Sequence, residues 1–335
     1  MLEKLLLIVT AASTFAALHP NILSGTASDD SQNATVMLFR LTPDKTAGNV
    51  CTAALIAPRL LLTARHCLAE ITNGSVACLP DGTPISTGGS VRTNYPANDL
   101  YVFTGKDRAA FTRLGPPTNE VDVNKWQPAG RGSQIFDDLS GTLCNHDIAL
   151  VLLEAPITNM PIAKMRLNGD ARGGEELLNV GYGITLTEFE PPVRQQRRGV
   201  TVKQVGPHDS FPILAKNEFS FNESICEGDS GGPIYSAKTG AVLGVVSRGS
   251  NGEDPTKPGV TCPNADNIGT KLAPFREMID QAFATAGAQP QLEPEEDEGC
   301  AVAAVGTPHA ATAASALALG LALLLVRRRR NSVVR

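Results

Sequence analysis

The sequence lacks any general excess of basic residues. Its 29 lysines and arginines stand against 34 aspartates and glutamates, for a formal net charge of −5. The one dense basic cluster, residues 327–330, lies beside an apolar run at the end of the chain. Because nucleic-acid binding depends on clustered cations, we expect no nucleic-acid partner. An apolar fraction of 42% likewise excludes a disordered or fibrous protein.

Motifs for metal binding are also missing. No C-x-x-C pair suggests a zinc site, and no spaced set of acidic residues forms an EF-hand loop, so we expect neither a metal nor an organic cofactor. The chain does contain seven cysteines, Cys51, Cys67, Cys78, Cys144, Cys226, Cys262 and Cys300. In an exported protein this number predicts disulfides, with six partners in the folded region and Cys300 left over.

Export is predicted by the amino-terminal end. Residues 5–18, LLLIVTAASTFAAL, follow Lys4 and form an apolar stretch with small residues near its end. Such a stretch is too short to span a membrane comfortably, and it is typical of a signal peptide, here residues 1–18. A buried amino-terminal helix is the alternative, since Glu3 weakens the positive start that export signals prefer.

No helical periodicity recurs before residues 273–287, APFREMIDQAFATAG, and no internal repeat is present. From about residue 30 to 272 the chain is instead a series of short β-prone runs separated by turn-rich segments, among them TVMLFRL, IALVLL and AVLGVVSRG. This pattern predicts an all-β fold, a barrel or a sandwich, with a helix at its end.

The carboxyl-terminal part changes character. Residues 288–300 are rich in acid and proline, which predicts a linker. Residues 301–326 include a long run without charge and precede a basic tail at 327–335. This order predicts a transmembrane or sorting helix with its cytoplasmic end last, so that the folded region faces outward.

Three motifs carry chemistry. They are LLTARHC, which contains His66; NHDIAL, which contains Asp147; and CEGDSGGP, which contains Ser230. A serine hydroxyl becomes nucleophilic when an imidazole takes its proton, and a carboxylate fixes that imidazole's tautomer. The motifs and their order resemble those of the chymotrypsin-like serine proteases, which implies a nucleophile Ser230, a general base His66 and an orienting acid Asp147.

The resemblance also implies a fold, a substrate and a partner. It predicts two perpendicular six-stranded antiparallel β-barrels with a carboxyl-terminal helix over residues 22–287, acting as a monomer on proteins or peptides. The backbone N–H groups of Gly228 and Ser230 would form the oxyanion hole. The implied disulfides are Cys51–Cys67 and Cys226–Cys262, which leaves Cys78–Cys144 as the third pair.

Substrate binding is implied at four positions. Ser247 and Gly249 lie in the segment SRG, which resembles the family's strand for pairing with a bound peptide. Ser224 falls at the base of the specificity pocket, and Asn267 falls near its wall. The absence of an acid at the base favours a large apolar or aromatic side chain, although Glu227 at the rim could attract a basic group.

Maturation is implied by Ile22, which begins a sequence resembling the family's processed amino terminus. Residues 19–21 would then be a short propeptide, and the new amino group would pair with Asp229. Several residues depart from the family pattern. Arg65 stands where alanine is usual, Thr52-Ala53 replace glycines, and Leu23-Ser24 replace the usual valine and glycine. His146, although next to Asp147, is predicted to be non-catalytic.

The tail has a resemblance of its own. Gly299-Cys300, an apolar span and arginines are similar to the carboxyl-terminal sorting tail of myxobacterial surface proteins, which predicts an enzyme anchored at the cell surface or membrane, or released after processing. An unprocessed inner-membrane anchor is the alternative. For the folded region, two other functions share the motifs: a catalytically inactive surface binding or adhesion module, and an esterase for small esters.

Overall fold

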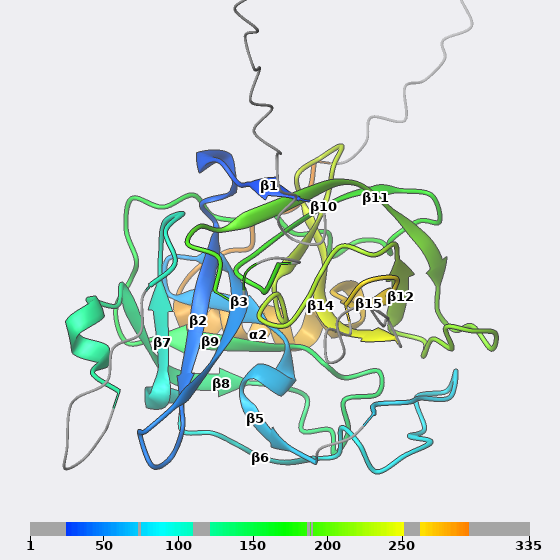
Figure 1. Ribbon diagram of the computed structural model, residues 1–335, viewed down its shortest axis with the longest axis horizontal. Coiled ribbons are helices and arrows are strands. Elements are labelled where there is room, and N and C mark those ends of the chain that lie inside the picture. Colours follow the sequence, from blue (N-terminus) through cyan, green and yellow to red (C-terminus); the bar gives the residue numbers. More distant parts are fainter. Residues whose placement is uncertain are drawn as a thin grey trace, which may run out of the picture. The chain divides into compact units, whose positions relative to one another are not determined.

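The computed structural model describes residues 25–72, 75–109, 121–185, 188, 190–250 and 262–294. Six antiparallel strands from the first half of the chain close into a barrel, in the order β2-β3-β4-β9-β8-β7 (Figure 1). These strands are β2 (Thr35–Leu41), β3 (Gly48–Ala57), β4 (Leu60–Thr63), β7 (Leu100–Phe103), β8 (Gly130–Phe136) and β9 (Ala149–Leu153). A separate pair, β5 (Ala69–Ile71) and β6 (Val91–Asn94), lies between β4 and β7 in the chain.

A second barrel is built from the second half. Its order is β11-β10-β13-β14-β15-β12, and pairing of β11 with β12 closes it, while β1 (Thr26–Ala27) adds to β11. The strands are β10 (Glu176–Gly181), β11 (Gln195–Val205), β12 (Glu218–Phe221), β13 (Pro233–Ser236), β14 (Val242–Ser250) and β15 (Asp266–Lys271). The prediction of an all-β fold with two six-stranded antiparallel barrels is confirmed.

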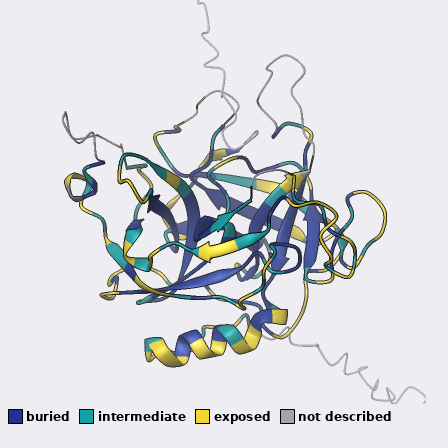
Figure 2. Ribbon diagram, turned by 90° about the horizontal axis from the view of Figure 1, so that it is seen from below, coloured by how far each residue is buried: buried dark blue, intermediate teal, exposed yellow. Residues whose placement is uncertain are grey.

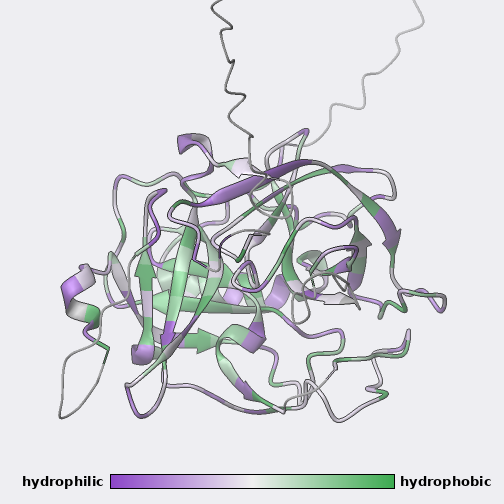
Figure 3. Cartoon of the chain, in the orientation of Figure 1, coloured by the Kyte–Doolittle hydropathy of each residue, from purple (hydrophilic) through white to green (hydrophobic). Residues whose placement is uncertain are grey.

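Side-chain alternation explains why these runs form barrels. In β3, Ala53 and Leu55 belong to one buried cluster, whereas Ala54 and Ile56 belong to another. Successive residues of a strand point to opposite faces, so an apolar run such as this one buries both faces. Figure 3 shows β2, β3 and β9 of the first barrel as mostly hydrophobic, whereas β11 of the second barrel is largely hydrophilic. Burying a side chain such as Leu55 completely stabilises the fold by about 2 kcal/mol.

The predicted carboxyl-terminal helix is present as α2 (Arg276–Ala286). Ile279, Ala282 and Phe283 are buried at helical spacing and join the cluster that includes strands of both barrels. Figure 2 shows the helix with this buried face toward the strands and an exposed face away from them. The helix ends at Gly287, whose φ of 66° is the left-handed conformation that favours glycine.

The folded unit extends to Glu293, beyond the expected end at residue 287. The N–H of Met165 donates to the carbonyl of Gln291 at 2.8 Å, and the N–H of Glu293 donates back to the carbonyl of Met165 at 2.8 Å. Backbone pairing with Met165 thus orders the first part of the predicted linker, which composition alone does not reveal. Cys300 and the rest of the expected linker, the span at 301–326 and the tail at 327–335 lie outside the described residues. Within the described ranges, no helix is both long and apolar enough to cross a membrane.

Candidate active site

His66 lies in a short 3-10 turn, Arg65–Cys67, directly after β4. A disulfide joins Cys67 to Cys51 in β3, with an S–S distance of 1.99 Å and a Cα–Cα distance of 6.2 Å. Because this bridge closes only a short loop, it ties the turn to the wall of the first barrel. The histidine is thereby held at the barrel end while its ring remains partly accessible.

Asp147 precedes β9 and is 1% exposed. Its Oδ1 accepts the backbone N–H of His66 at 2.9 Å, and its Oδ2 lies 2.8 Å from Nδ1 of the same residue. Ser247 Oγ donates to Oδ2 at 2.6 Å. Since an ionised carboxylate only accepts hydrogen bonds, the proton of His66 belongs on Nδ1, which leaves Nε2 unprotonated and able to act as a base.

The electrostatics of this pair agree with its geometry. Burial disfavours the imidazolium, but the charge of Asp147 and the hydrogen bond to it prevail, so the pKa of His66 is raised above 6.5. Burial also disfavours the Asp147 carboxylate, yet His66 and Ser247 lower the pKa of that carboxyl below 3.8. Asp147 therefore stays ionised, and the two groups stabilise each other's charged forms.

Ser230 lies in the loop before β13, and its carbonyl accepts the N–H of Thr52 at 2.8 Å. Thr52 Oγ1 donates to the carbonyl of Gly228 at 2.8 Å and accepts the N–H of Tyr182 at 3.1 Å. Through these hydrogen bonds, Thr52 of the first barrel holds the loop that carries Ser230 in the second barrel. Ser230 and His66 line the same cavity, whose volume is about 460 Å³.

The predicted oxyanion donors are available in this conformation. In the described part of the chain, neither the N–H of Gly228 nor that of Ser230 donates to a protein acceptor. Gly228 has a φ of 95°, and Gly231 has a φ of 76° with Thr63 Oγ1 only 2.0 Å from where a Cβ would lie. Glycine is required at both positions for the loop to turn this tightly.

Asp229 is 1% exposed, and its two oxygens each accept one backbone N–H, from Gly183 at 2.8 Å and from Cys226 at 2.9 Å. A Cβ on Gly181 would lie 2.1 Å from Oδ1, so the glycines flanking Tyr182 make room for the carboxylate. Burial raises the pKa of Asp229 to about 7, against the lowering effects of these two hydrogen bonds and of Arg108. Its expected partner, Ile22, lies outside the described residues.

The residues predicted to bind substrate separate into two groups. Ser247 and Gly249 lie in β14, and Gly249 lines a second cavity of about 510 Å³ that shares no residue with the first. Ser224 is fully buried and accepts a hydrogen bond from Asn179 at 2.7 Å. Asn267 is 1% exposed and donates to the carbonyl of Asn222 at 3.0 Å. Neither Ser224 nor Asn267 is among the described residues that line either cavity.

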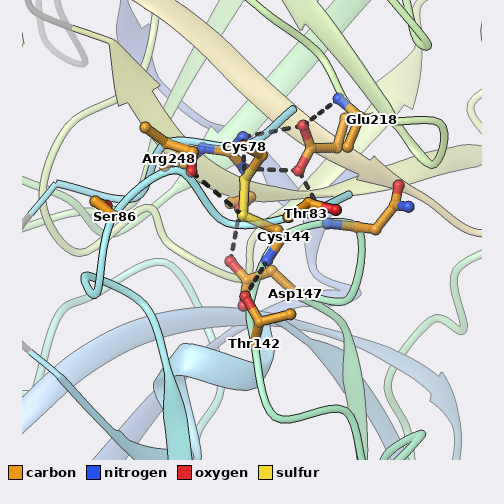
Figure 4. Close-up of a disulfide and its surroundings, with 12 residues drawn as sticks. Cys78, Thr83, Ser86, Thr142, Cys144, Asp147, Glu218 and Arg248 are labelled. Carbon is orange, nitrogen blue, oxygen red and sulfur yellow. Dashed lines mark hydrogen bonds and ion pairs between the residues drawn. A yellow bond between two sulfur atoms is a disulfide. The ribbon is translucent and has the colours of Figure 1, made fainter. Parts of the chain in front are cut away.

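Sequence reasoning missed an acid beside this site. Glu218, at the start of β12, is fully buried and binds Arg248 of β14 through two hydrogen bonds of 2.9 Å (Figure 4). The same carboxylate accepts the N–H of Asn145, two residues before Asp147, at 3.2 Å and that of Ala215 at 2.9 Å. No sequence signal would have found this contact, because its partners are far apart in the chain.

A second charged group surrounds the turn that carries His66. Arg65 is 5% exposed, lies 3.0 Å from Asp137 and 3.3 Å from Asp138, and donates to the carbonyl of Ser140 at 2.7 Å. His146 Nδ1 contacts Asp138, so this histidine binds away from Asp147. The sequence marked Arg65 only as a departure from the family pattern, without showing its partners.

The three disulfides in the described region pair Cys51 with Cys67, Cys78 with Cys144 and Cys226 with Cys262. Cys78–Cys144 joins the segment before β6 to the loop that leads to Asp147, beside the Glu218–Arg248 pair (Figure 4). Cys51, His66 and Cys67 bring three potential metal ligands within 4.8 Å of one another. Because both cysteines are oxidised, they offer no thiolate, and this group does not fit a metal.

The sequence is similar to one protein-family model and to one known protease. Residues 102–267 match the family model named Trypsin. The cercarial protease of Schistosoma mansoni is 25% identical over 250 residues, which cover 72% of this chain and 81% of that protein. The two matches support a trypsin-like serine protease. The matched range includes Asp147 and Ser230, while His66 lies before it in the sequence and lines the same cavity as Ser230.

Proposed function

We propose that this protein is an extracellular serine endopeptidase that hydrolyses peptide bonds through an acyl-enzyme on Ser230. The observation that carries the proposal is the Asp147–His66 pair beside the cavity that Ser230 also lines. His66 Nε2 would take the proton of Ser230 Oγ as the oxygen attacks the carbonyl carbon, and would then return it to the leaving amine. Asp147 holds the ring and stabilises the imidazolium that forms.

The negative charge on the carbonyl oxygen needs donors that are not already engaged. The N–H groups of Gly228 and Ser230 meet this condition in the described structure. Donors that are fixed before the reaction stabilise the transition state more than the substrate, and one such donor typically contributes about 3 kcal/mol. The intact loop geometry therefore supports catalysis over a binding module without activity.

Binding of an extended peptide is supported by the free edge of β14. Residues Arg248 and Gly249 pair with Ile268 and Asn267 of β15 on one side. On the other side, the pairing of β14 with β13 in the described structure ends at Val245. A peptide could therefore add as a strand beside residues 247–249, which favours a peptidase over an esterase for small esters.

The function is tested by incubating the processed protein with an unfolded protein substrate and mapping the products by mass spectrometry. The proposal expects internal cleavage that is lost in Ser230→Ala and His66→Ala. Asp147→Asn should lower kcat by about 10⁴, because the ring then takes the wrong tautomer. His146→Asn is the matched control and should retain activity, because the ring of His146 binds Asp138. Equal cleavage by wild type and Ser230→Ala would contradict the proposal.

Maturation at Ile22 is the part of the proposal that depends on Asp229. In the part of the chain that the structure describes, the buried carboxylate of Asp229 accepts two backbone N–H groups and forms no ion pair, and a new amino group would supply the cation that it lacks. A form with one extra residue before Ile22 should lose activity, by roughly tenfold or more, because its amino group cannot reach the carboxylate. Full activity of that extended form would contradict the maturation step while leaving the catalytic proposal intact.

Export is supported by the three disulfides, which persist in oxidising compartments outside the cytosol. Anchoring through residues 301–326 rests on the sequence alone. Fractionation of cells that express the full chain, beside a version ending at Pro294, tests it. The anchored form predicts that only the full chain stays with the membrane or cell surface.

A further inference from the structure

The cavity beside Ser230 and His66 extends past the Cys51–Cys67 disulfide to the end of β2, where Arg40 forms part of its wall. Four charged side chains line this cavity: Arg40, Arg108, Glu190 and Glu227. Of these, Glu190 and Glu227 are exposed, whereas Arg40 is only 8% exposed. Charges at the rim are screened by water, so the buried cation decides which ligand the wall favours.

Arg40 has no carboxylate partner in the described part of the chain. Its Nε is buried without an acceptor, and its guanidinium lies 3.8 Å from the ring centre of Tyr95. The side-chain oxygen of Asn49, with its amide oriented to satisfy both of its atoms, accepts one N–H at 2.5 Å. Burial lowers the pKa of Arg40, and only Tyr95 acts against that effect. The charge of Arg40 is therefore left uncompensated by any described acid.

Arg108, which lines the same cavity, differs from Arg40 in the acids near it. Arg108 donates to the carbonyl of Tyr182, and burial lowers its pKa while the charges of Glu190 and Asp229 raise it. The Nε of Arg108 is also buried without an acceptor, so the two arginines differ in the acids near them and not in this donor. Glu227 remains exposed at the rim. A buried guanidinium with no acid near it is well suited to hold a planar carboxylate, because its N–H groups match the carboxylate oxygens.

The position of Arg40 in the cavity determines which half of a peptide substrate it could contact. Neither Ser247 nor Gly249 of the free β14 edge lines the cavity that contains Arg40, so under the proposed function we assign that edge to the half of the peptide that becomes the acyl group. The half that departs as an amine receives its proton from His66, so this amine must lie beside the ring of His66. His66 and Arg40 line the same cavity.

We infer that Arg40 forms a carboxylate-binding subsite for the leaving-group half of the substrate. The ligand is a carboxylate of that half, which can come from an aspartate or glutamate side chain or from the free carboxyl terminus of the peptide. This inference rests on the proposed function, because it requires an acyl-enzyme on Ser230.

Acyl transfer tests the subsite without knowledge of the residue preferred before the cleaved bond. p-Nitrophenyl acetate acylates Ser230, and an added dipeptide amine competes with water for the acyl group. In the transfer, the ester bond to Ser230 Oγ breaks, an amide forms at the amine nitrogen, and the amine proton passes through His66 to Ser230 Oγ. The ratio of amide to acetate measures binding of the amine on the leaving-group side, and it does not depend on how much protein is active.

Three comparisons separate the two sources of carboxylate. Alanyl-glutamate amide and glutamyl-alanine amide are each compared with the corresponding glutamine compound, and free alanyl-alanine with its amide. At least one carboxylate compound should exceed its neutral partner by roughly tenfold or more, as expected for a charge-assisted hydrogen bond. Arg40→Met should remove that preference, and Arg40→Lys should keep part of it.

Arg131→Met is the matched control, because Arg131 also lies over a tyrosine ring, 5.4 Å from the centre of Tyr101, but does not line the cavity. It should retain the preference of the wild type. Equal ratios for every carboxylate compound and its neutral partner in wild type would overturn the subsite even if Arg40→Met failed to fold. Failure of Ser230 to acylate at all would instead reject the proposed function.

Discussion

Two buried aspartates of this site show how partners decide the charge of a side chain. Asp147 and Asp229 are both 1% exposed. Asp147 binds a histidine ring and a hydroxyl besides a backbone N–H, and these contacts lower the pKa of its carboxyl. Within the described residues, Asp229 accepts hydrogen bonds from two backbone N–H groups only, and burial raises its pKa to about 7 although Arg108 acts against this effect. The carboxylate of Asp147 is ionised by its surroundings, and that of Asp229 needs a further cation to become so.

Asp229 therefore predicts a pH dependence of stability for a form extended before Ile22. Its folded-state pKa of about 7 lies above the unfolded value of 3.8, so between these pH values the folded protein binds more protons than the unfolded one. The contribution of Asp229 to the free energy of unfolding is then full below about pH 4 and is lost as the pH rises toward 7. Urea unfolding of the extended form and of its Asp229→Asn variant across this range measures it.

The variant should lack this component of the pH dependence. The form with a free Ile22 amine should also lack it, because an ammonium partner would lower the pKa of the carboxyl. Identical pH profiles for the extended form and Asp229→Asn would contradict this account of the site.

At the residue scale, the sequence predicted positions better than contacts. His66, Asp147 and Ser230 stand in short motifs, so their identities could be inferred locally. In the sequence, Thr52 and Arg65 stand out only as departures from the family pattern. The structure gives each of them hydrogen bonds to residues far along the chain, Thr52 to Gly228 and Arg65 to Ser140, which no local pattern encodes.

At the scale of secondary-structure elements, the Glu218–Arg248 ion pair between β12 and β14 is the contact least expected from the sequence. Both oxygens of Glu218 accept two hydrogen bonds each, and the donors come from β14, from Ala215 and from the loop before Asp147. Ser247, next to Arg248, donates to Asp147 as well. The Glu218–Arg248 pair thus holds two segments that both reach Asp147.

Breaking this pair should be costly. Glu218→Gln leaves the charge of Arg248, whose side chain is 13% exposed, without its partner, and we expect a loss of about 3 kcal/mol in the free energy of unfolding. Glu218→Gln combined with Arg248→Met should recover part of that loss, because no unpaired charge remains. Urea unfolding of the wild type, both single variants and the double variant measures the coupling.

The control is the pair of Arg92 and Glu70, whose side chains are 64% and 43% exposed. Glu70→Gln should change the free energy of unfolding by less than about 1 kcal/mol, as is usual for exposed ion pairs. If Glu218→Gln lowered the free energy of unfolding no more than Glu70→Gln does, the Glu218–Arg248 pair would not stabilise the contact between β12 and β14.

For the whole molecule, the short β-prone runs predicted an all-β barrel or sandwich and the helical period predicted the final helix, whereas the two barrels were implied by the resemblance to chymotrypsin-like serine proteases. The end of the folded unit could not be predicted in this way. Residues 288–293, AQPQLE, begin the predicted linker, yet Glu293 binds Arg166, which is 7% exposed and also binds Glu175. The ordering of this segment depends on partners that are distant in sequence.

This boundary predicts a difference between two truncated proteins. A chain that ends at Gly287 loses both hydrogen bonds to Met165 and one of the two carboxylates of Arg166. It should unfold with a free energy lower by about 3 kcal/mol than a chain that ends at Pro294. Glu293→Gln in the longer chain isolates the contribution of the ion pair. Equal stability of the two truncated chains would show that the segment adds nothing to the fold.

The most direct test of the central claim is labelling of the processed protein, beginning at Ile22, with a fluorophosphonate probe that reacts with activated serines. The account predicts one modified residue, Ser230, found by peptide mass mapping and absent from Ser230→Ala and His66→Ala. Absence of labelling in a protein with a proven free Ile22 terminus and all three disulfides would contradict the claim that Ser230 is an activated nucleophile.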